Sequence, residues 1–464
     1  MTGLGSDLSR LIGSANVRDL PEDVLAYAND ATHYFKSRPP DAVVLPTTKE
    51  EVAAVLKYAS THTIPVTPRG AGSGLSGGCT PVKGGIVMDM KRMNRLIEID
   101  DRNMTAIAEA GMVLDTFHKA VAKRGLFYPP DPQSMTVCTL GGNVSTRAGG
   151  PRGVKYGTTG QYVTGLELVL PDGEIIKTGG KFVKHSVGYD LTHLLTGAEG
   201  TLGVITQVNV RLLPQPEASR TVVVACGSLE QTAEVVSEVI ARGAVPAMME
   251  FMTQRAADRY NALGGISWPP AAGYLLIALD GSQVQIEAEA RKIQEICSDL
   301  KAIGFIDVAD PILAAKYWKT RSNGYPLLMT TYKRVNTEDI TVPRNRLPDM
   351  VRGVQAISAS IGIMIGLGGH AGDGNIHPTV LQMEVNDDIN KKAKQAIDAI
   401  IRLGLDLGGA ISGEHGIGIH KAEYLEWELG SPQIALMRRI KAAFDPKAIM
   451  NPGKIWTEGE GAHV

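Results

Sequence analysis

The segment from residue 69 to residue 78, Arg-Gly-Ala-Gly-Ser-Gly-Leu-Ser-Gly-Gly, constrains the fold more than any other part of this 464-residue chain. Five of its last nine residues are glycine, so neither a helix nor a regular strand is expected to run through it. Successive glycines expose backbone N–H groups, which favours a concave nest for an anion such as a pyrophosphate. Arg69 would add a positive charge to that nest. A plain flexible loop is the alternative interpretation.

The spacing Gly72-x-Gly74-x-x-Gly77 formally matches the dinucleotide fingerprint of Rossmann folds. In a Rossmann fold this loop must open a helix, whereas the following Cys-Thr-Pro-Val-Lys-Gly-Gly cannot continue as one. The segment therefore predicts a phosphate-binding loop of another fold.

The length of the chain predicts two or three domains, and the turn-rich segment Pro-Gln-Pro-Glu-Ala-Ser after Leu213 is the best boundary in the first half. Before it, Thr48 and Glu51 form a capping box that opens a helix with a buried stripe. After it, an antiparallel sheet covered by helices on one face is expected. The predicted strands and helices of that unit are residues 220–226, 229–242, 273–279 and 284–301.

Two further segments follow the glycine loop, TLGGNVSTRAGG from Thr139 and GAEGTLGVIT from Gly197. Together and in this order, the three segments resemble the FAD-binding fold of vanillyl-alcohol-oxidase type. The resemblance implies the following flavin neighbours: Arg69, Gly70, Ala71, Gly72, Ser73, Gly74, Leu75, Ser76, Pro132, Ser134, Thr139, Gly142, Asn143, Ser145, Gly149, Glu199, Ile205 and Asn451. Some members attach FAD through a histidine of the first loop; here Ser73 stands in that place, so non-covalent FAD is expected.

The same resemblance implies an α+β fold with three parts. A two-subdomain FAD-binding domain is expected over residues 1–215, and a cap domain with the metal site over residues 216–425. Residues 426–464 would form a C-terminal segment that returns to the FAD domain.

Four of the ten histidines lie between residues 370 and 420. Asp373-Gly374 predicts a two-residue hairpin turn, which would place His370 and His377 directly opposite each other, close enough to hold one metal ion. Glu414 would supply an oxygen ligand and leave open positions, as in a catalytic site. The alternative is a turn whose histidines satisfy local hydrogen bonds.

HxGDGNxH followed by GEHG resembles the FAD-linked D-2-hydroxy-acid dehydrogenases, which include D-lactate dehydrogenases, the flavin subunit of glycolate oxidase and D-2-hydroxyglutarate dehydrogenases. This resemblance implies that His370, His377 and Glu414 bind a divalent metal (zinc, manganese or iron) and that His415 is the catalytic base. It implies oxidation of a D-2-hydroxy acid, with D-lactate expected, to the 2-oxo acid.

A guanidinium suits the substrate carboxylate because arginine binds carboxylates through two parallel hydrogen bonds. The segment ending at Arg321 resembles the W-x-x-R segment of the family, so Arg321 is expected to bind substrate; a surface arginine on a helix is the alternative. Lys333 and Arg334 lie where the family often has a second substrate-side cation, and which of them points inward stays open. A second cation would favour a dicarboxylate.

The charges nearly cancel, with 47 Lys and Arg against 49 Asp and Glu, which gives no field for nucleic acid. The four cysteines lie at least 59 residues apart, so the chain has no motif for an iron–sulfur cluster. We therefore expect electrons to pass to a separate acceptor: a quinone, a cytochrome, an electron-transferring flavoprotein or an iron–sulfur subunit. With no signal peptide or transmembrane segment recognisable, a cytoplasmic protein is expected, peripheral to a membrane only through a partner.

Two other hypotheses stay open. A flavin-containing oxidase or transferase of the same fold would share the flavin segments but would give no reason for the histidine motifs. A flavin subunit active only within an electron-transfer complex would share all of them.

Overall fold

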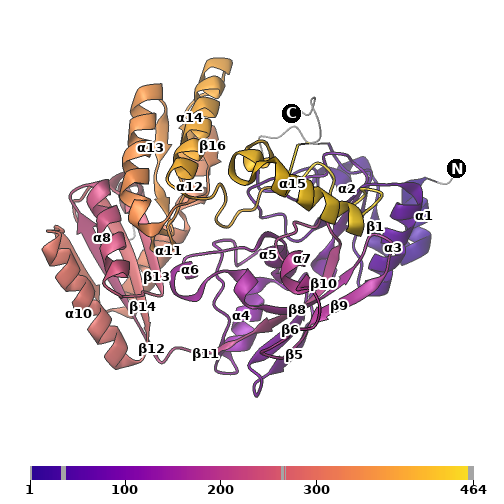
Figure 1. Cartoon of the computed structure of the whole chain (residues 1–464), viewed down its shortest axis with the longest axis horizontal. Coiled ribbons are helices and arrows are strands. Elements are labelled where there is room, and N and C mark those ends of the chain that lie inside the picture. Colours follow the sequence, from indigo (N-terminus) through magenta and orange to yellow (C-terminus); the bar gives the residue numbers. More distant parts are fainter. Residues whose placement is uncertain (1–2, 33–37, 263–265, 267, 458–464) are drawn as a thin grey trace. The chain divides into compact units, whose positions relative to one another are not determined.

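A computed structural model describes residues 3–32, 38–262, 266 and 268–457 of the chain (Figure 1). The chain divides into two compact units. Unit 1 comprises residues 1–148, 158–215 and 414–464; unit 2 comprises residues 149–157 and 216–413. The expected mixture of helices and sheets is confirmed.

The first sheet of unit 1 leads into the glycine-rich loop. Its elements are α1 Leu4–Ile12, η1 Ser14–Asn16, β1 Val17–Arg18, α2 Pro21–Leu25, β2 Ala42–Val44, α3 Lys49–His62, β3 Val66–Arg69, β4 Ile86–Asp89 and η2 Met90–Arg92. The strand order is β1-β2-β4-β3, with parallel pairing of β2, β4 and β3. Leu8 of α1, Val55 of α3 and Ile86 of β4 share one buried core.

The predicted helix start at Thr48 is confirmed. The Thr48 hydroxyl accepts a hydrogen bond from the N–H of Glu51 at 3.2 Å, so it caps α3. The Glu51 carboxylate accepts from the N–H of Thr47, one residue earlier than a capping box requires.

The second sheet of unit 1 is antiparallel and has the order β5-β6-β10-β8-β9. The elements around it are β5 Leu96–Asp100, β6 Thr105–Glu109, α4 Leu114–Ala122, β7 Leu126–Phe127, α5 Leu140–Thr146, η3 Thr159–Gln161, β8 Val163–Val169, β9 Ile175–Gly179, α7 Leu191–Leu195, β10 Val204–Arg211 and β11 Leu213–Pro214. The third predicted flavin segment leads directly into β10.

The C-terminal part of unit 1 contains η6 Ala422–Tyr424 and α15 Leu425–Phe444, which is kinked at Gly430. After α15 the chain runs beside β3, where Val66 forms a parallel bridge with Met450. Residues 449–451 thus lie next to β3, the strand that precedes the glycine-rich loop.

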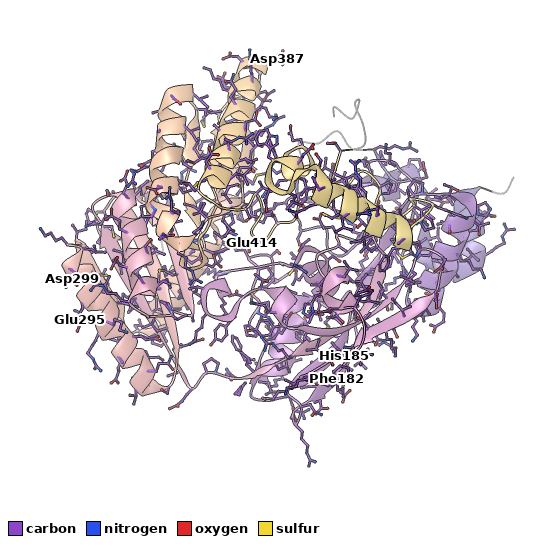
Figure 2. The ribbon with its side chains drawn as sticks, viewed as in Figure 1. Phe182, His185, Glu295, Asp299, Asp387 and Glu414 are labelled. Carbon is purple, nitrogen blue, oxygen red and sulfur yellow. The ribbon has the colours of Figure 1, made fainter. Side chains whose placement is uncertain are left out.

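The large sheet of unit 2 is antiparallel, in the order β15-β12-β14-β13-β19, as expected for the cap. Its strands and nearby helices are β12 Ala218–Cys226, α8 Leu229–Ala241, β13 Met248–Thr253, α9 Gln254–Ala262, β14 Gly273–Gly281, α10 Gln283–Asp299, β15 Gly304–Val308, α11 Pro311–Ser322 and β19 Gly368–Gly369. Helices α8 and α10 cover one face, and Glu295 and Asp299 of α10 project away from it (Figure 2).

The opposite face of this sheet is also covered, which the sequence interpretation did not expect. Tyr317 of α11 packs with Val223 of β12 and Leu276 of β14 in a second buried cluster. Side chains two residues apart on a strand share a face, so Val223 and Val222 point to different sides.

The remaining elements of unit 2 carry the histidine segment. They are α6 Gly153–Tyr156, α12 Gly324–Thr331, β16 Arg334–Thr337, β17 Ile340–Thr341, η4 Arg344–Arg346, α13 Leu347–Ile361, β18 Met364–Gly366, η5 Ala371–Asp373, β20 Asn375–Ile376, β21 Thr379–Gln382 and α14 Asp387–Asp406. Strands β16, β21 and β18 form one small sheet, and β17 pairs with β20. In the part of the chain that the structure describes, no helix combines the length and apolar character needed to cross a membrane.

Candidate active site

The glycine-rich loop, residues 70–76, leaves its backbone N–H groups available to a ligand. None of them donates a hydrogen bond within the described ranges. Gly72 has φ +72°, and a Cβ atom there would lie 2.2 Å from Nη2 of Arg69. The guanidinium of Arg69 is held in place because its Nη1 donates to the carbonyl of Asn29 at 2.9 Å. A loop with unpaired backbone N–H groups next to a guanidinium fits the pyrophosphate of FAD.

The second predicted flavin segment contacts the first. Thr139 caps α5 by accepting the N–H of Gly142 at 3.2 Å. A Cβ atom at Gly70 would lie 2.4 Å from the Thr139 hydroxyl, so only glycine permits this approach. Nearby, Asn143 is buried, and its Nδ2 has no hydrogen-bond partner among the residues described. A buried amide donor without an acceptor is costly, so it fits a site that a polar ligand completes.

The third segment is joined to the C-terminal part of unit 1 through Glu199 and Asn451. The Glu199 carboxylate accepts the N–H groups of Ile417 at 2.8 Å and Gly418 at 2.7 Å. Burial raises the pKa of Glu199, and these two N–H groups partly offset that effect. Asn451 donates from Nδ2 to the carbonyls of Gly78 and Glu199. Both side chains therefore hold the frame of the glycine-rich loop.

The other predicted flavin neighbours are placed as follows. Pro132 and Ser134 form a turn before α5, and the Ser145 hydroxyl donates to the carbonyl of Gly141 within that helix. Ile205 lies in β10, whereas Gly149 belongs to the short segment assigned to unit 2.

In unit 2, His370 and His377 lie close together, with ring centroids 5.2 Å apart and ring planes nearly perpendicular. The predicted hairpin that would explain this is wrong. Asp373 and Gly374 do form a turn, but β19 before it pairs with β13, and β20 after it pairs with β17. His370 occupies the N-cap position of the short helix η5, without a capping side-chain hydrogen bond, instead of lying in a strand. The two arms still meet, because the N–H of His377 donates to the carbonyl of Gly368 at 2.6 Å, so an irregular turn rather than a two-residue hairpin brings the imidazoles together.

A buried carboxylate joins His370 to Arg321. Glu250 accepts from Nδ1 of His370 at 2.6 Å and pairs with Nη2 of Arg321 at 2.6 Å. Burial alone would raise the pKa of Glu250, but His370 and Arg321 together lower it, so the carboxylate stays ionised. The sequence interpretation found His370 and Arg321 but missed Glu250, which lies in β13 with no motif around it.

Asp339 is a second buried acid that the sequence interpretation missed. It accepts from Nδ2 of Asn375 at 2.8 Å, from the Ser412 hydroxyl at 2.8 Å and from the N–H of Gly413 at 3.0 Å. A ligand atom of Asp339 and one of His377 lie within 4.8 Å of each other. The donors are two side chains and one backbone N–H from the segments of the predicted motifs, which Asp339 joins in the folded chain.

Glu414 and His415 begin the last segment of unit 1, directly after Gly413 (Figure 2 labels Glu414). Their nearest ligand atoms, Oε1 of Glu414 and Nε2 of His415, are 3.9 Å apart. The carbonyl of His415 accepts a hydrogen bond from the Ser76 hydroxyl at 3.1 Å. The predicted base is therefore anchored to the glycine-rich loop.

The predicted second cation has two candidates with different surroundings. Lys333 is exposed, and its N–H donates to the carbonyl of Gln382. Arg334 is half-buried and donates to Oδ1 of Asn390 at 3.1 Å. Neither contact involves Glu250 or a histidine of the motif.

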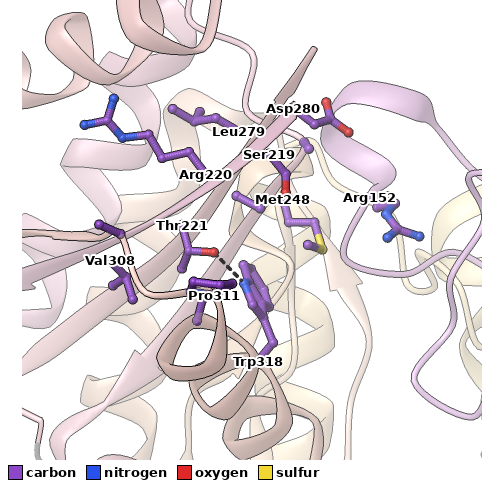
Figure 3. A pocket seen from close by; sticks show the side chains of 14 residues that line it. Arg152, Ser219, Arg220, Thr221, Met248, Leu279, Asp280, Val308, Pro311 and Trp318 are labelled. Carbon is purple, nitrogen blue, oxygen red and sulfur yellow. Dashed lines mark hydrogen bonds between the residues drawn. The ribbon is translucent and has the colours of Figure 1, made fainter. Parts of the chain in front are cut away.

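A pocket of about 310 Å³ lies on the α11 face of the large sheet of unit 2 (Figure 3). Trp318 closes one side and donates from Nε1 to the Thr221 hydroxyl at 3.1 Å. Asp280 lies on another side, bonded to Lys155 and Tyr156. Because Trp318 and Arg321 are about one helical turn apart on α11, the pocket is a neighbour of the predicted substrate arginine.

Comparison with known proteins bears on both units. Residues 40–179 match the family model described as FAD binding domain, and residues 215–455 match that of the FAD linked oxidases, C-terminal domain. The glycolate oxidase subunit GlcD of Bacillus subtilis is 40% identical, with 97% of this chain and 96% of that protein covered. The D-lactate dehydrogenase of Anaerostipes hadrus is 34% identical, with 96% and 94% covered.

Among solved structures, p-cresol methylhydroxylase superposes with a TM-score of 0.79 over 98% of this chain and 96% of that one. Its sequence identity of 17% means that this likeness concerns the fold alone. The two family models and the relatives show the family as well as the fold, and both predicted resemblances are confirmed. The chain belongs to the family of FAD-linked oxidoreductases that includes D-lactate dehydrogenases and glycolate oxidase flavin subunits, with the vanillyl-alcohol-oxidase-type fold.

Proposed function

We propose that this chain oxidises a D-2-hydroxy acid, with D-lactate as its substrate, to the 2-oxo acid with the help of FAD and a divalent metal. The observation that carries the proposal is the chain of contacts from the paired imidazoles of His370 and His377 through Glu250 to Arg321. It puts donors for a cation beside a guanidinium suited to a carboxylate. A 2-hydroxy acid offers a hydroxyl and a carboxylate on adjacent carbons and would engage both.

FAD would be held by the N–H groups of residues 70–76 and by Asn143, without a covalent bond because Ser73 is not a nucleophile of the kind that attaches flavin. Acid precipitation of the purified protein should therefore leave the flavin in the supernatant. A yellow pellet would contradict non-covalent binding.

The residues that would hold the metal are His370, His377 and Glu414. The donor set fits a divalent cation: the two imidazoles lie 5.2 Å apart between centroids, and a ligand atom of Asp339 lies within 4.8 Å of one of His377. Hydride acceptance by flavin and stabilisation of negative charge on the substrate hydroxyl by a cation are the chemistry that the two groups supply when bound.

The side chains of the protein would bind the substrate and move one proton. Arg321 would orient the substrate carboxylate, and His415 would remove the proton of the substrate hydroxyl. An imidazole with an ordinary pKa near 6.5 suits a base at neutral pH. A separate electron acceptor would be needed, because the sequence carries no iron–sulfur motif.

Glycolate within a multi-subunit oxidase is the second candidate, because the relative at 40% identity is named as a subunit of glycolate oxidase. Glycolate lacks the methyl group of lactate but has the same hydroxyl and carboxylate. The two candidates therefore differ in substrate and partners and share the chemistry.

An anaerobic titration tests the proposal. Purified protein is mixed with D-lactate, L-lactate, glycolate and longer D-2-hydroxy acids, and the bleaching of the flavin absorbance is followed. We expect stoichiometric bleaching by D-lactate and little by L-lactate. Faster bleaching by glycolate would favour the second candidate, and no bleaching by any of these acids would contradict both.

A further inference from the structure

The carboxylate of Glu250 occupies an unusual position for a charged group. It is fully buried in the middle of β13, on the same side of the sheet as Met248 and Met252. Its Oε1 contacts Nδ1 of His370, whose exposure is 3%, and its Oε2 contacts Nη2 of Arg321. A buried carboxylate needs compensating partners, and here Oε1 is hydrogen-bonded to His370 while Oε2 forms an ion pair with Arg321 without hydrogen-bond geometry.

The two partners come from distant parts of unit 2. His370 is separated from Glu250 by 120 positions and occupies the N-cap position of η5, whereas Arg321 lies near the end of α11. An ion pair needed only for stability would not have to join a predicted metal ligand to a predicted substrate-binding residue. The contacts of Glu250 thus fix the orientation of the His370 imidazole and of the Arg321 guanidinium relative to each other.

We propose that Glu250 is a positioning residue that orients the metal ligand His370 and the substrate-binding residue Arg321 at the same time. This inference rests on the proposed function for the roles of those two residues. The contact at Nδ1 makes that nitrogen the proton carrier of a neutral His370, so that Nε2 has the lone pair that a cation requires. On the other side, Glu250 holds the guanidinium of Arg321 by one nitrogen.

Arg321 keeps donors for a second carboxylate. Its Nε is buried and has no hydrogen-bond acceptor within the ranges that the structure describes. A guanidinium has five N–H groups, and Glu250 engages only the Nη2 side. The substrate carboxylate would satisfy donors that Glu250 leaves unused, so the orientation fixed by Glu250 sets the angle of substrate binding.

The variant Glu250→Gln keeps the size of the side chain and removes its ability to orient His370 and Arg321. The amide has the same shape, but it carries no charge and has a single acceptor oxygen, so it cannot serve His370 and Arg321 as the carboxylate does. We expect a dissociation constant for Mn²⁺ about 10–100-fold higher than that of wild type, since second-shell partners of metal ligands have effects of this size. We also expect the KM for D-lactate to rise by more than about tenfold. The guanidinium of Arg321 binds a carboxylate through two parallel hydrogen bonds only when its plane is correctly oriented, and Glu250 would no longer fix that orientation.

The matched control is Glu167→Gln. Glu167 is also a buried strand glutamate in an ion pair, with Lys49 at 2.9 Å, and it accepts from the Thr206 hydroxyl, but it belongs to unit 1. Its replacement should leave the Mn²⁺ dissociation constant within about twofold of wild type. Any general effect of removing a buried charge would show in both variants.

The experiment uses the full-length FAD-loaded protein after chelation and desalting. Mn²⁺ binding is measured by isothermal titration calorimetry without substrate, and KM and kcat are measured separately with an artificial electron acceptor. If Glu250→Gln does not fold, Glu250→Asp retains the charge but withdraws it by one methylene, and an intermediate loss of Mn²⁺ affinity is expected.

Three outcomes decide the question. Weaker Mn²⁺ binding together with a higher KM in the Glu250 variants, and not in Glu167→Gln, supports the positioning role. Unchanged Mn²⁺ binding in both Glu250 variants overturns that role while the proposed function survives. A wild-type protein that binds no Mn²⁺ overturns both.

Discussion

Replacing His415 by alanine is expected to lower kcat for D-lactate by about 10²–10⁴-fold while the flavin spectrum stays that of wild type. The imidazole would remove the hydroxyl proton, and without it water must do so. The contact between the Ser76 hydroxyl and the backbone carbonyl of His415 does not involve the imidazole, so the segment should remain in place. Stopped-flow reduction under anaerobic conditions measures the effect on the flavin step directly.

His62→Ala is the matched control for this prediction. His62 is exposed at the end of α3, and its Nδ1 contacts the carbonyl of Tyr58 one helical turn earlier. Its loss should leave the reduction rate unchanged. Wild-type rates in His415→Ala would show that another group is the base.

Removal of the metal is expected to abolish reduction of the flavin by D-lactate, whereas reduction by dithionite should persist. Dithionite needs no hydroxyl to be deprotonated, so it reports only whether the flavin is present and reducible. Mn²⁺ or Zn²⁺ added back after chelation should restore the reaction with lactate. His377→Ala should resist this rescue, because the lost imidazole is a proposed ligand and its removal should cost more than the 10–100-fold typical of outer partners.

Chelator alone can mislead by extracting FAD, so absorbance of the bound flavin must be recorded beside each rate. Full activity of thoroughly demetallated protein, verified by elemental analysis, would contradict a metal-dependent mechanism. The family assignment would still stand, because it rests on the matched domains and relatives.

The flavin-binding frame was predictable because its signals are local. The five glycines from Gly70 to Gly78 predict that the backbone comes close to another group, whatever the rest of the fold is. The contact of Gly70 with Thr139 confirms this prediction. The helix cap at Thr48 is equally local. In both places, the residues that interact are the residues that form the pattern.

The histidine segment shows where local reasoning fails. Asp373-Gly374 does turn the chain, but a turn signal does not say which strands its two arms will pair with. The arms pair with β13 and β17, from two different sheets. His370 and His377 still come close, because the turn also lets the N–H of His377 donate to the carbonyl of Gly368 in the other arm.

Glu250 and Asp339 could not be identified from the sequence as parts of the site. A single acidic residue in a strand has no periodic or spaced pattern around it, and its meaning depends on partners far along the chain. Glu250 meets His370 across 120 positions, a relationship that only the folded sheet creates.

The bridge between Val66 and Met450 has a bearing on biosynthesis. The strand that precedes the glycine-rich loop is synthesised long before Met450, its neighbour, and before Asn451, which donates to the carbonyl of Gly78. Intervening residues 216–413 form a compact unit that is complete much earlier. A nascent chain therefore lacks part of the frame of the glycine-rich loop until Asn451 has been translated, so we expect stable binding of FAD only after residues 216–413 have been made.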